Sequence, residues 1–144
     1  MAIVGISLDE TREYISKHDP DRGKPTIFVI GLLDPFVRSY VDDQMTQFGI
    51  SPGGPDKPAQ TSINISGRNL EIVRFGLRDI KNLIDPVTKE AVRFISDTIP
   101  VKGKSYKAVS DQILRLIPPI VIKELAREIG NDNLLMEDEV KNLP

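Results

Sequence analysis

The sequence contains no cysteine and only one histidine, and these two shortages exclude several kinds of chemistry. Without thiols the chain can form no disulfide, no thiolate nucleophile and no cysteine-bound zinc or iron–sulfur site. His18 has no second imidazole with which to share a metal ion, and its neighbours Lys17 and Asp19 indicate an exposed turn. We therefore predict that the protein is not an enzyme and has no catalytic residue, no metal site and no cofactor.

Long apolar runs, a basic leader and an excess of one charge are also missing. The most apolar stretches, 27–33 and 114–122, are broken well short of a membrane span. The first residues carry no basic cluster and soon reach Asp9 and Glu10, which argues against a signal peptide. The net charge is only -2, without the basic excess typical of nucleic-acid binding. We therefore expect neither a membrane nor a nucleic-acid partner. We also expect the protein to be assembled in the cytoplasm.

Composition and length are those of an ordinary folded domain. The chain has 144 residues, of which 40% are hydrophobic and 28% are charged. This balance argues against disorder of the whole chain, and the length suffices for one domain with its own core. We predict a single domain over 1–144, with a flexible loop or arm at about 50–60 and an extended C-terminal segment over 131–144.

The stretch 66–95 predicts a helix, a turn and a strand that bury apolar surface. Ser66 can cap a helix in which apolar residues recur at steps of three and four as far as Ile84. Asp85-Pro86 would end this helix, and the β-branched and aromatic content of 91–95 predicts a short strand.

Earlier in the chain, capping signals predict two more helices around one buried strand. Ser7 and Glu10 form a capping box that predicts a short helix through Lys17. The stretch 26–30 is apolar on both faces and predicts a buried strand. Asp34-Pro35 predicts the start of a core helix that ends at Gly49, before a Pro/Gly-rich loop at 51–58 and a weak edge strand at 61–65.

The C-terminal third predicts a lysine-bearing loop and two helices. The stretch 99–106 is polar and favours an exposed basic loop, and a helix over about 110–117 is interrupted by Pro118-Pro119. A second helix should then end at Gly130, followed by a linker at 131–133 and a final turn or two of helix. Together these elements predict an α+β fold that is mainly α, with helices on a small antiparallel sheet and a Pro/Gly-rich loop or arm.

Two local patterns resemble binding motifs but lack required parts. Gly103-Lys104-Ser105 resembles the end of a phosphate-binding loop, but Thr98 stands where the first glycine is needed and Pro100 removes an amide donor. Asp19 and Asp21 resemble the start of a calcium loop whose later oxygen ligands are missing. A basic loop and a turn are the simpler interpretations.

Several short stretches form a further pattern: 13–17 with 24–28, 75–83 with the strand that follows, and 124–129 with Glu137, Lys141 and Asn142. These stretches resemble a family of small proteins from tailed bacteriophages that are encoded among head and tail structural genes. Where the family pattern has tryptophan and phenylalanine, this chain has Ile80 and Leu83. The resemblance implies a component of the virion, or a tail assembly chaperone that leaves before the particle is complete.

The resemblance and the lack of reactive groups together predict a non-catalytic virion structural protein, capsid-associated, decorating the head or joining head to tail. Tail assembly chaperone and small regulatory or nucleotide-binding protein remain as alternatives. The expected partners are capsid, connector or tail subunits and further copies of the chain in a multicopy assembly. Segments outside the predicted core elements are expected to make the contacts. The expected contact residues are Gly53, Gly54, Lys102, Lys104, Lys107, Leu134, Leu135, Met136 and Val140.

Overall fold

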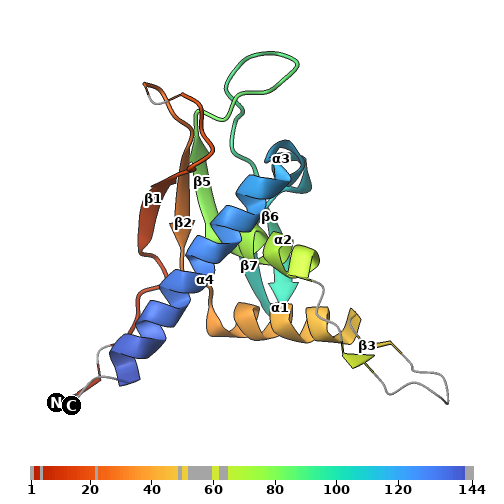
Figure 1. The fold of residues 1–144 in the computed structure, drawn as a ribbon. Helices are drawn as coiled ribbons and strands as arrows, with labels where there is room; N and C mark the ends of the chain where they lie inside the picture. Colours follow the sequence, from red (N-terminus) through yellow and green to blue (C-terminus); the bar gives the residue numbers. More distant parts are fainter. Residues whose placement is uncertain are drawn as a thin grey trace.

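The computed structural model describes the backbone of residues 2–3, 5–21, 23–48, 50–51, 60–61 and 65–141, and the side chains of this part up to residue 44 and from 66 to 133. Figure 1 shows helices on one side of a small sheet and a separate hairpin. In chain order the elements are β1 (Thr11–Ile15), β2 (Ile27–Gly31), α1 (Pro35–Phe48), β3 (Ile50–Ser51), β4 (Gln60–Thr61), α2 (Ile65–Gly76), β5 (Leu77–Lys81), β6 (Ser96–Val101), β7 (Lys104–Val109), α3 (Asp111–Leu116) and α4 (Pro119–Lys141).

The fold is α+β, but the prediction of a mainly α fold on one small sheet is wrong. In the described part of the chain, β1, β2 and β5 form an antiparallel sheet in the order β1-β2-β5, and β6 and β7 form a separate hairpin. The very short strands β3 and β4 also pair with each other. Three segments that were expected to be helix or loop are strands, and each has an identifiable reason.

The first of these segments is the N-terminal one, where the predicted helix over 7–17 is replaced by β1. Thr11 pairs with Gly31 and Ile15 with Ile27, so β1 runs antiparallel to β2. Arg12 and Tyr14 are half-buried while the residues on either side are exposed, which is the period of two expected of a strand. Contacts of these two side chains with α4 therefore outweigh the local capping signal.

The second segment lies in the predicted helix over 66–84, which ends at Gly76 and continues directly as β5. Leu77 and Ile80 are both buried although they are three residues apart. The register against β2 shifts here, since Val29 is opposite Asp79 but Ile30 is opposite Leu77. This β-bulge places two residues three apart on the same face of a strand. It therefore imitates the helical spacing on which the prediction depended.

The third segment is 96–109, where an exposed basic loop was expected at 99–106 and the structure has the β6–β7 hairpin. Its two-residue turn is Lys102-Gly103, with φ of 49° and 84°. Positive φ at both positions matches the twist of a tight hairpin. The strand predicted at 91–95 is not formed. Ala91 makes a single bridge with Ile84, and the next strand, β6, begins at Ser96.

The helices α1, α3 and α4 begin where the sequence predicts. The Asp34 carboxylate accepts a hydrogen bond from the Phe36 amide at 2.8 Å, and Ser110 caps α3. However, α4 does not end at Gly130 and no linker follows at 131–133. Ile129 is fully buried and Asp132 is paired with Arg12, so these contacts hold the helix through a glycine that costs only about 1 kcal/mol.

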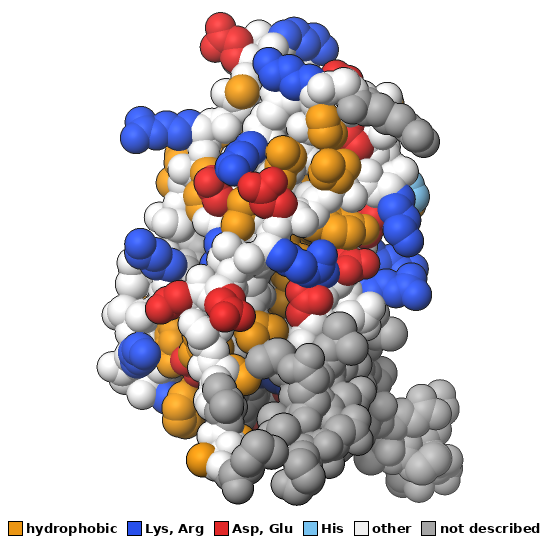
Figure 2. All heavy atoms as spheres, turned by 90° about the vertical axis from the view of Figure 1, so that its left-hand side faces the viewer, with side chains coloured by type: hydrophobic (Ala, Val, Ile, Leu, Met, Phe, Trp, Pro, Cys, Tyr) orange, Lys and Arg blue, Asp and Glu red, His pale blue; other side chains and the backbone are white. Residues whose placement is uncertain are grey.

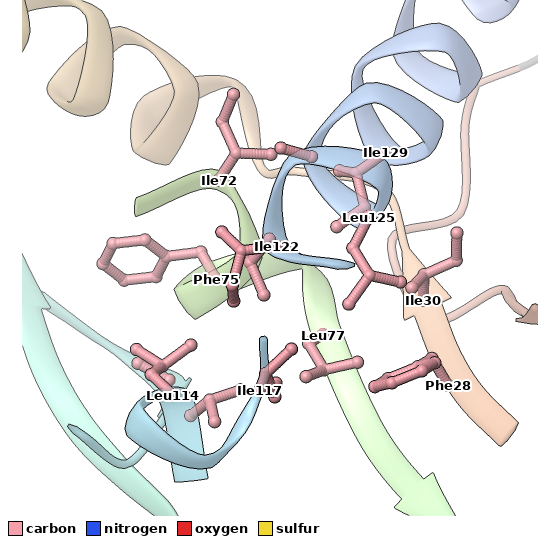
Figure 3. Packing of buried hydrophobic residues seen from close by; sticks show 14 of the residues in the cluster. Phe28, Ile30, Ile72, Phe75, Leu77, Leu114, Ile117, Ile122, Leu125 and Ile129 are labelled. Carbon is pink, nitrogen blue, oxygen red and sulfur yellow. The ribbon is translucent and has the colours of Figure 1, made fainter. Parts of the chain in front are cut away.

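The core lies between α4, α2, α3 and the inner face of the sheet (Figure 3), and α1 and the β6–β7 hairpin also contribute buried side chains to it. It is entirely aliphatic and aromatic, and its labelled members are Phe28, Ile30, Ile72, Phe75, Leu77, Leu114, Ile117, Ile122, Leu125 and Ile129. α2 and α4 approach closely where Gly76 faces Ile129. This approach is possible because Gly76 has no side chain, and it leaves no space for one. Among the helices described, none is long and apolar enough to cross a membrane.

Candidate partner-binding surface

A groove lies between α1, α2 and α4, with a volume of about 470 Å³. We call it the helix groove. Its floor is apolar and its rim is polar and charged. The floor consists of Leu33, Val41, Ile72 and Ala126. The charged residues of the rim are Arg38, Asp42, Arg68, Lys123 and Arg127.

The charge of the helix groove is positive. Its described lining contains four cationic side chains and a single carboxylate, that of Asp42. Arg68 Nε lies 3.1 Å from Asp42 Oδ1, but both side chains are substantially exposed, so this ion pair contributes little to stability. The excess of cationic over acidic side chains in this lining favours an anionic partner.

A second hollow of about 510 Å³ continues the helix groove between α2, α3 and α4. The two hollows share Asn69 and Lys123, so they adjoin along the line where α2 meets α4. Leu70, Leu114 and Ile122 make the second hollow more apolar, with Arg115 at its rim. Apolar floors flanked by charged side chains are typical of surfaces that bind a protein segment.

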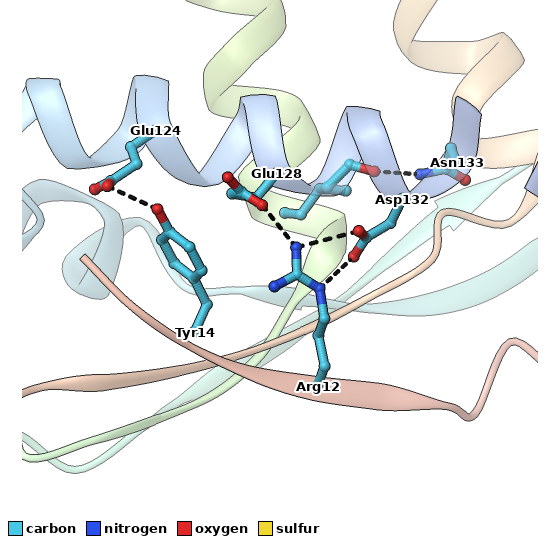
Figure 4. A network of polar contacts seen from close by, with 7 residues as sticks. Arg12, Tyr14, Glu124, Glu128, Asp132 and Asn133 are labelled. Carbon is cyan, nitrogen blue, oxygen red and sulfur yellow. Dashed lines mark hydrogen bonds and ion pairs between the residues drawn. The ribbon is translucent and has the colours of Figure 1, made fainter. Parts of the chain in front are cut away.

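A polar network joins β1 to the neighbouring face of α4 (Figure 4). Arg12 Nε lies 2.8 Å from Asp132 Oδ2, and its Nη2 lies 2.8 Å from Glu128 Oε2. The Tyr14 hydroxyl donates to Glu124 Oε2 at 2.8 Å, and Glu124 also accepts from the Ser16 hydroxyl and the Lys17 amide. We call these contacts the β1–α4 link.

The β1–α4 link fixes the charge states of its members. Burial, reinforced by the hydrogen bond to Glu124, raises the pKa of Tyr14 to about 12. Burial alone would raise the pKa of Glu124, but the hydrogen bonds from Ser16, Lys17 and Tyr14 outweigh it and lower this pKa. Both shifts move the groups further from neutral pH, whereas an acid–base catalyst needs a pKa near it. The network is therefore suited to holding β1 on α4.

The three lysines that the sequence analysis selected lie on the β6–β7 hairpin. Lys102 is in the turn, and Lys104 and Lys107 border a depression of about 160 Å³ together with Arg78. Lys104 Nζ lies 5.3 Å from the centre of the Tyr106 ring. This depression also contains two carboxylates, those of Asp9 and Asp34, so its charge is mixed. It shares no lining residue with the helix groove.

The other predicted contact residues are only partly placed. Gly53 and Gly54 lie outside the described residues. Leu134, Leu135, Met136 and Val140 belong to the last turns of α4, and their side chains lie outside the described part. These two groups of residues therefore stay predictions.

The sequence analysis missed the cations of the helix groove, although a signal for part of them was present. Lys123, Arg127 and Gly130 are spaced by four and three residues, which places them on one face of α4. Charged residues on a helix normally indicate a solvated face. Only the fold shows that α1 and α2 form walls opposite this one.

A projecting arm over 82–95 was also missed (Figure 1). The Asp85 carboxylate accepts hydrogen bonds from the amides of Val87 and Thr88, and the Val92 amide donates to the Leu83 carbonyl at 2.7 Å. Val87 is 86% exposed, which is unusual for a β-branched apolar side chain in an ordered segment. The arm is a second candidate contact region.

The coloured surface in Figure 2 mixes acidic and basic side chains, with hydrophobic ones between them. This face has no field of one sign of the kind that steers nucleic acid. Among the described residues, no group of three or more histidine, aspartate or glutamate side chains lies close enough to hold a metal ion. No protein-family model, curated protein or solved structure matches the chain.

Proposed function

We propose that this protein is a non-catalytic structural component of a tailed-bacteriophage particle, and that it binds neighbouring proteins through the helix groove and the projecting arm over 82–95. The observation that carries the proposal is the pair of adjoining hollows along α2 and α4, with apolar floors and a positive rim. A partner segment would bury aliphatic side chains on the floor and place acidic ones at the rim. The resemblance to phage head and tail proteins supplies the class of partner.

The chemistry of the hollows supports binding. Most of their lining consists of aliphatic side chains, asparagines and cations, with the Asp42 carboxylate and the Ser66 hydroxyl as the other polar side chains among the described lining residues. The Asp42 carboxylate is paired with Arg68, so it is not positioned as a base. Tyr14, whose pKa is raised, and Glu124, whose pKa is lowered, belong to the β1–α4 link and line neither hollow.

Mass spectrometry of purified particles and of unassembled intermediates tests the proposal. We expect the chain at a fixed stoichiometry in finished particles. A tail assembly chaperone would instead be found with free tail subunits and be absent from the particle. Finding it with neither would contradict both roles.

Charge-reversed chains test the role of the groove in the same assay. The double variant Lys123→Glu/Arg127→Glu should be lost from the assembly, because it removes the positive rim. The variant Lys17→Glu/Lys24→Glu carries the same change in charge on exposed residues between β1 and β2 and should be retained. Equal loss of both would show that overall charge, and not the groove, determines incorporation.

A further inference from the structure

β1 is an edge strand of the three-stranded sheet, and one of its two edges is open. The strand order is β1-β2-β5, so β2 pairs with β1 on one side only. In the part of the chain that the structure describes, no other backbone group is hydrogen-bonded to Thr11–Ile15. Figure 1 shows β1 as the outermost strand of this sheet. The open edge therefore presents backbone amides and carbonyls that have no partner strand.

Two other strands have features that hinder pairing with a further strand. The opposite edge of the same sheet is β5, which has a β-bulge against β2 and in which the Asp79 carboxylate accepts the Ile80 amide at 2.8 Å. β6 contains Pro100, which has no amide to donate. Bulges and prolines are common means by which proteins block strand edges. β1 has neither, since its five residues pair with β2 in one unbroken register.

The β1–α4 link holds β1 in its extended shape. Arg12 Nε lies 2.8 Å from Asp132 Oδ2, and the Tyr14 hydroxyl donates to Glu124. Both side chains extend from the same face of β1 toward α4 (Figure 4). A strand that is already ordered loses little conformational freedom when another strand pairs with it. The open edge is therefore preorganised for binding.

The face of β1 that points away from α4 carries the side chains that would select a partner. Its residues Thr11, Glu13 and Ile15 are exposed. Glu13 Oε1 lies 3.2 Å from Lys81 Nζ, but both side chains are more than half exposed, so this ion pair is weak and leaves Glu13 accessible. A strand added at the open edge would place one residue beside Glu13 and another, two positions along, beside Ile15.

We propose that the open edge of β1 binds an extended segment of another protein, which adds to the sheet as a fourth strand. The segment has a basic residue opposite Glu13 and a β-branched apolar residue opposite Ile15. Its backbone pairs with β1 and supplies affinity, while these two side chains supply specificity. β1 contributes no residue to the helix groove, so this inference goes beyond the proposed function and does not depend on it.

Charge favours such a segment over a second copy of β1. Two antiparallel β1 strands would pair all five of their residues only in the register centred on Glu13. In this register the two Glu13 carboxylates are directly opposite each other, and like charges in that position destabilise a strand pair. A segment with a basic residue at the same place makes an attractive pair instead.

Titration of the isotope-labelled full chain with a synthetic peptide, followed by NMR, tests the proposal. The probe is the blocked octapeptide Thr-Lys-Thr-Val-Thr-Lys-Thr-Val, in which lysine and valine share one face of an extended strand. We expect chemical-shift changes concentrated at residues 11–15, and slower amide exchange there. A version of the peptide that is N-methylated throughout has no backbone donors and should not bind.

Charge exchange tests the predicted specificity. Glu13→Lys should weaken binding of the peptide by about fivefold or more, because like charges then meet. A peptide with glutamate in place of lysine should bind this variant better than it binds the wild type. Glu90→Lys makes the same change in charge at an exposed residue of the projecting arm and should bind the original peptide as the wild type does. Circular dichroism checks that both variants are folded.

A wild-type chain that does not bind the peptide at millimolar concentration would overturn the proposal, and so would equal binding of the N-methylated peptide. Shift changes in β1 that depend on the concentration of the chain alone would show that a second copy occupies the open edge, and would also overturn it. None of these results bears on the helix groove, so the particle experiment stands in every case.

Discussion

Gly76 and Ile129 meet where α2 crosses α4, and a Cβ placed on Gly76 would lie 2.7 Å from Ile129 Cδ1. Ile129 is fully buried, so it has little space into which to move. We expect Gly76→Ala to lower the free energy of unfolding by about 1–3 kcal/mol, the usual cost of overfilling a close-packed core. Urea denaturation followed by circular dichroism measures the change.

Gly130 provides the matched control for this prediction. Gly130 is a glycine of α4, and a Cβ placed on it meets no atom within 4 Å. Gly130→Ala should therefore raise the free energy of unfolding, by up to about 1 kcal/mol, through helix propensity alone. Destabilisation of both variants by the same amount would show that the contact between Gly76 and Ile129 is not the cause.

The β1–α4 link predicts that lysine cannot replace Arg12. One guanidinium contacts both Asp132 and Glu128, a geometry that a single ammonium group reproduces poorly. Because the Arg12 side chain is 40% exposed, solvent weakens the pair, and Arg12→Lys should cost only about 0.5–1 kcal/mol. A double-mutant cycle with Asp132→Asn should give a non-zero coupling energy. Strict additivity would mean that the ion pair contributes nothing.

The raised pKa of Tyr14 predicts a loss of stability in alkali. The phenol has an ordinary pKa of 10.0 when unfolded and about 12 when folded, so its protonated form is favoured by folding. Its contribution is complete below pH 10 and is lost as the pH rises toward 12. We expect the difference in unfolding free energy between wild type and Tyr14→Phe to shrink across this window. A difference that stays constant to pH 12 would contradict the assignment.

The hairpin turn predicts a stabilising substitution. Lys102 has φ of 49°, a left-handed conformation that costs an ordinary residue about 1–2 kcal/mol. Asparagine tolerates this conformation, and Asn-Gly is the preferred pair for such a turn. Lys102→Asn should raise the melting temperature. Because the variant also removes a predicted contact lysine, unchanged incorporation into particles would exclude Lys102 from the partner interface.

The sequence predicted those elements whose signals are local. Asp34-Pro35 and Ser110 mark helix starts that do not depend on distant residues, and β2 is apolar on both faces. The errors arose where distant contacts decide the structure. Nothing near Arg12 in the sequence indicates Asp132, 120 residues away, whose contact helps to hold β1 as a strand.

The candidate site was predicted less well than the fold, because a groove depends on three elements at once. The lysines were selected for lying outside core elements, yet they are on a regular hairpin. The groove cations were passed over because a helical surface charge looks the same whether or not another helix faces it. The C-terminal residues Leu134 and Val140 remain predictions.

The absence of any loop between α2 and β5 has a mechanical consequence. Gly76 is the last residue of the helix and Leu77 the first of the strand, and both are buried. A hinge needs a residue free to change its backbone angles, and none is available at this junction. A displacement of α2 by a molecule seated in the groove would therefore be transmitted as rigid motion to the central sheet, so occupancy on one side should alter amide-exchange rates in β5 and β2.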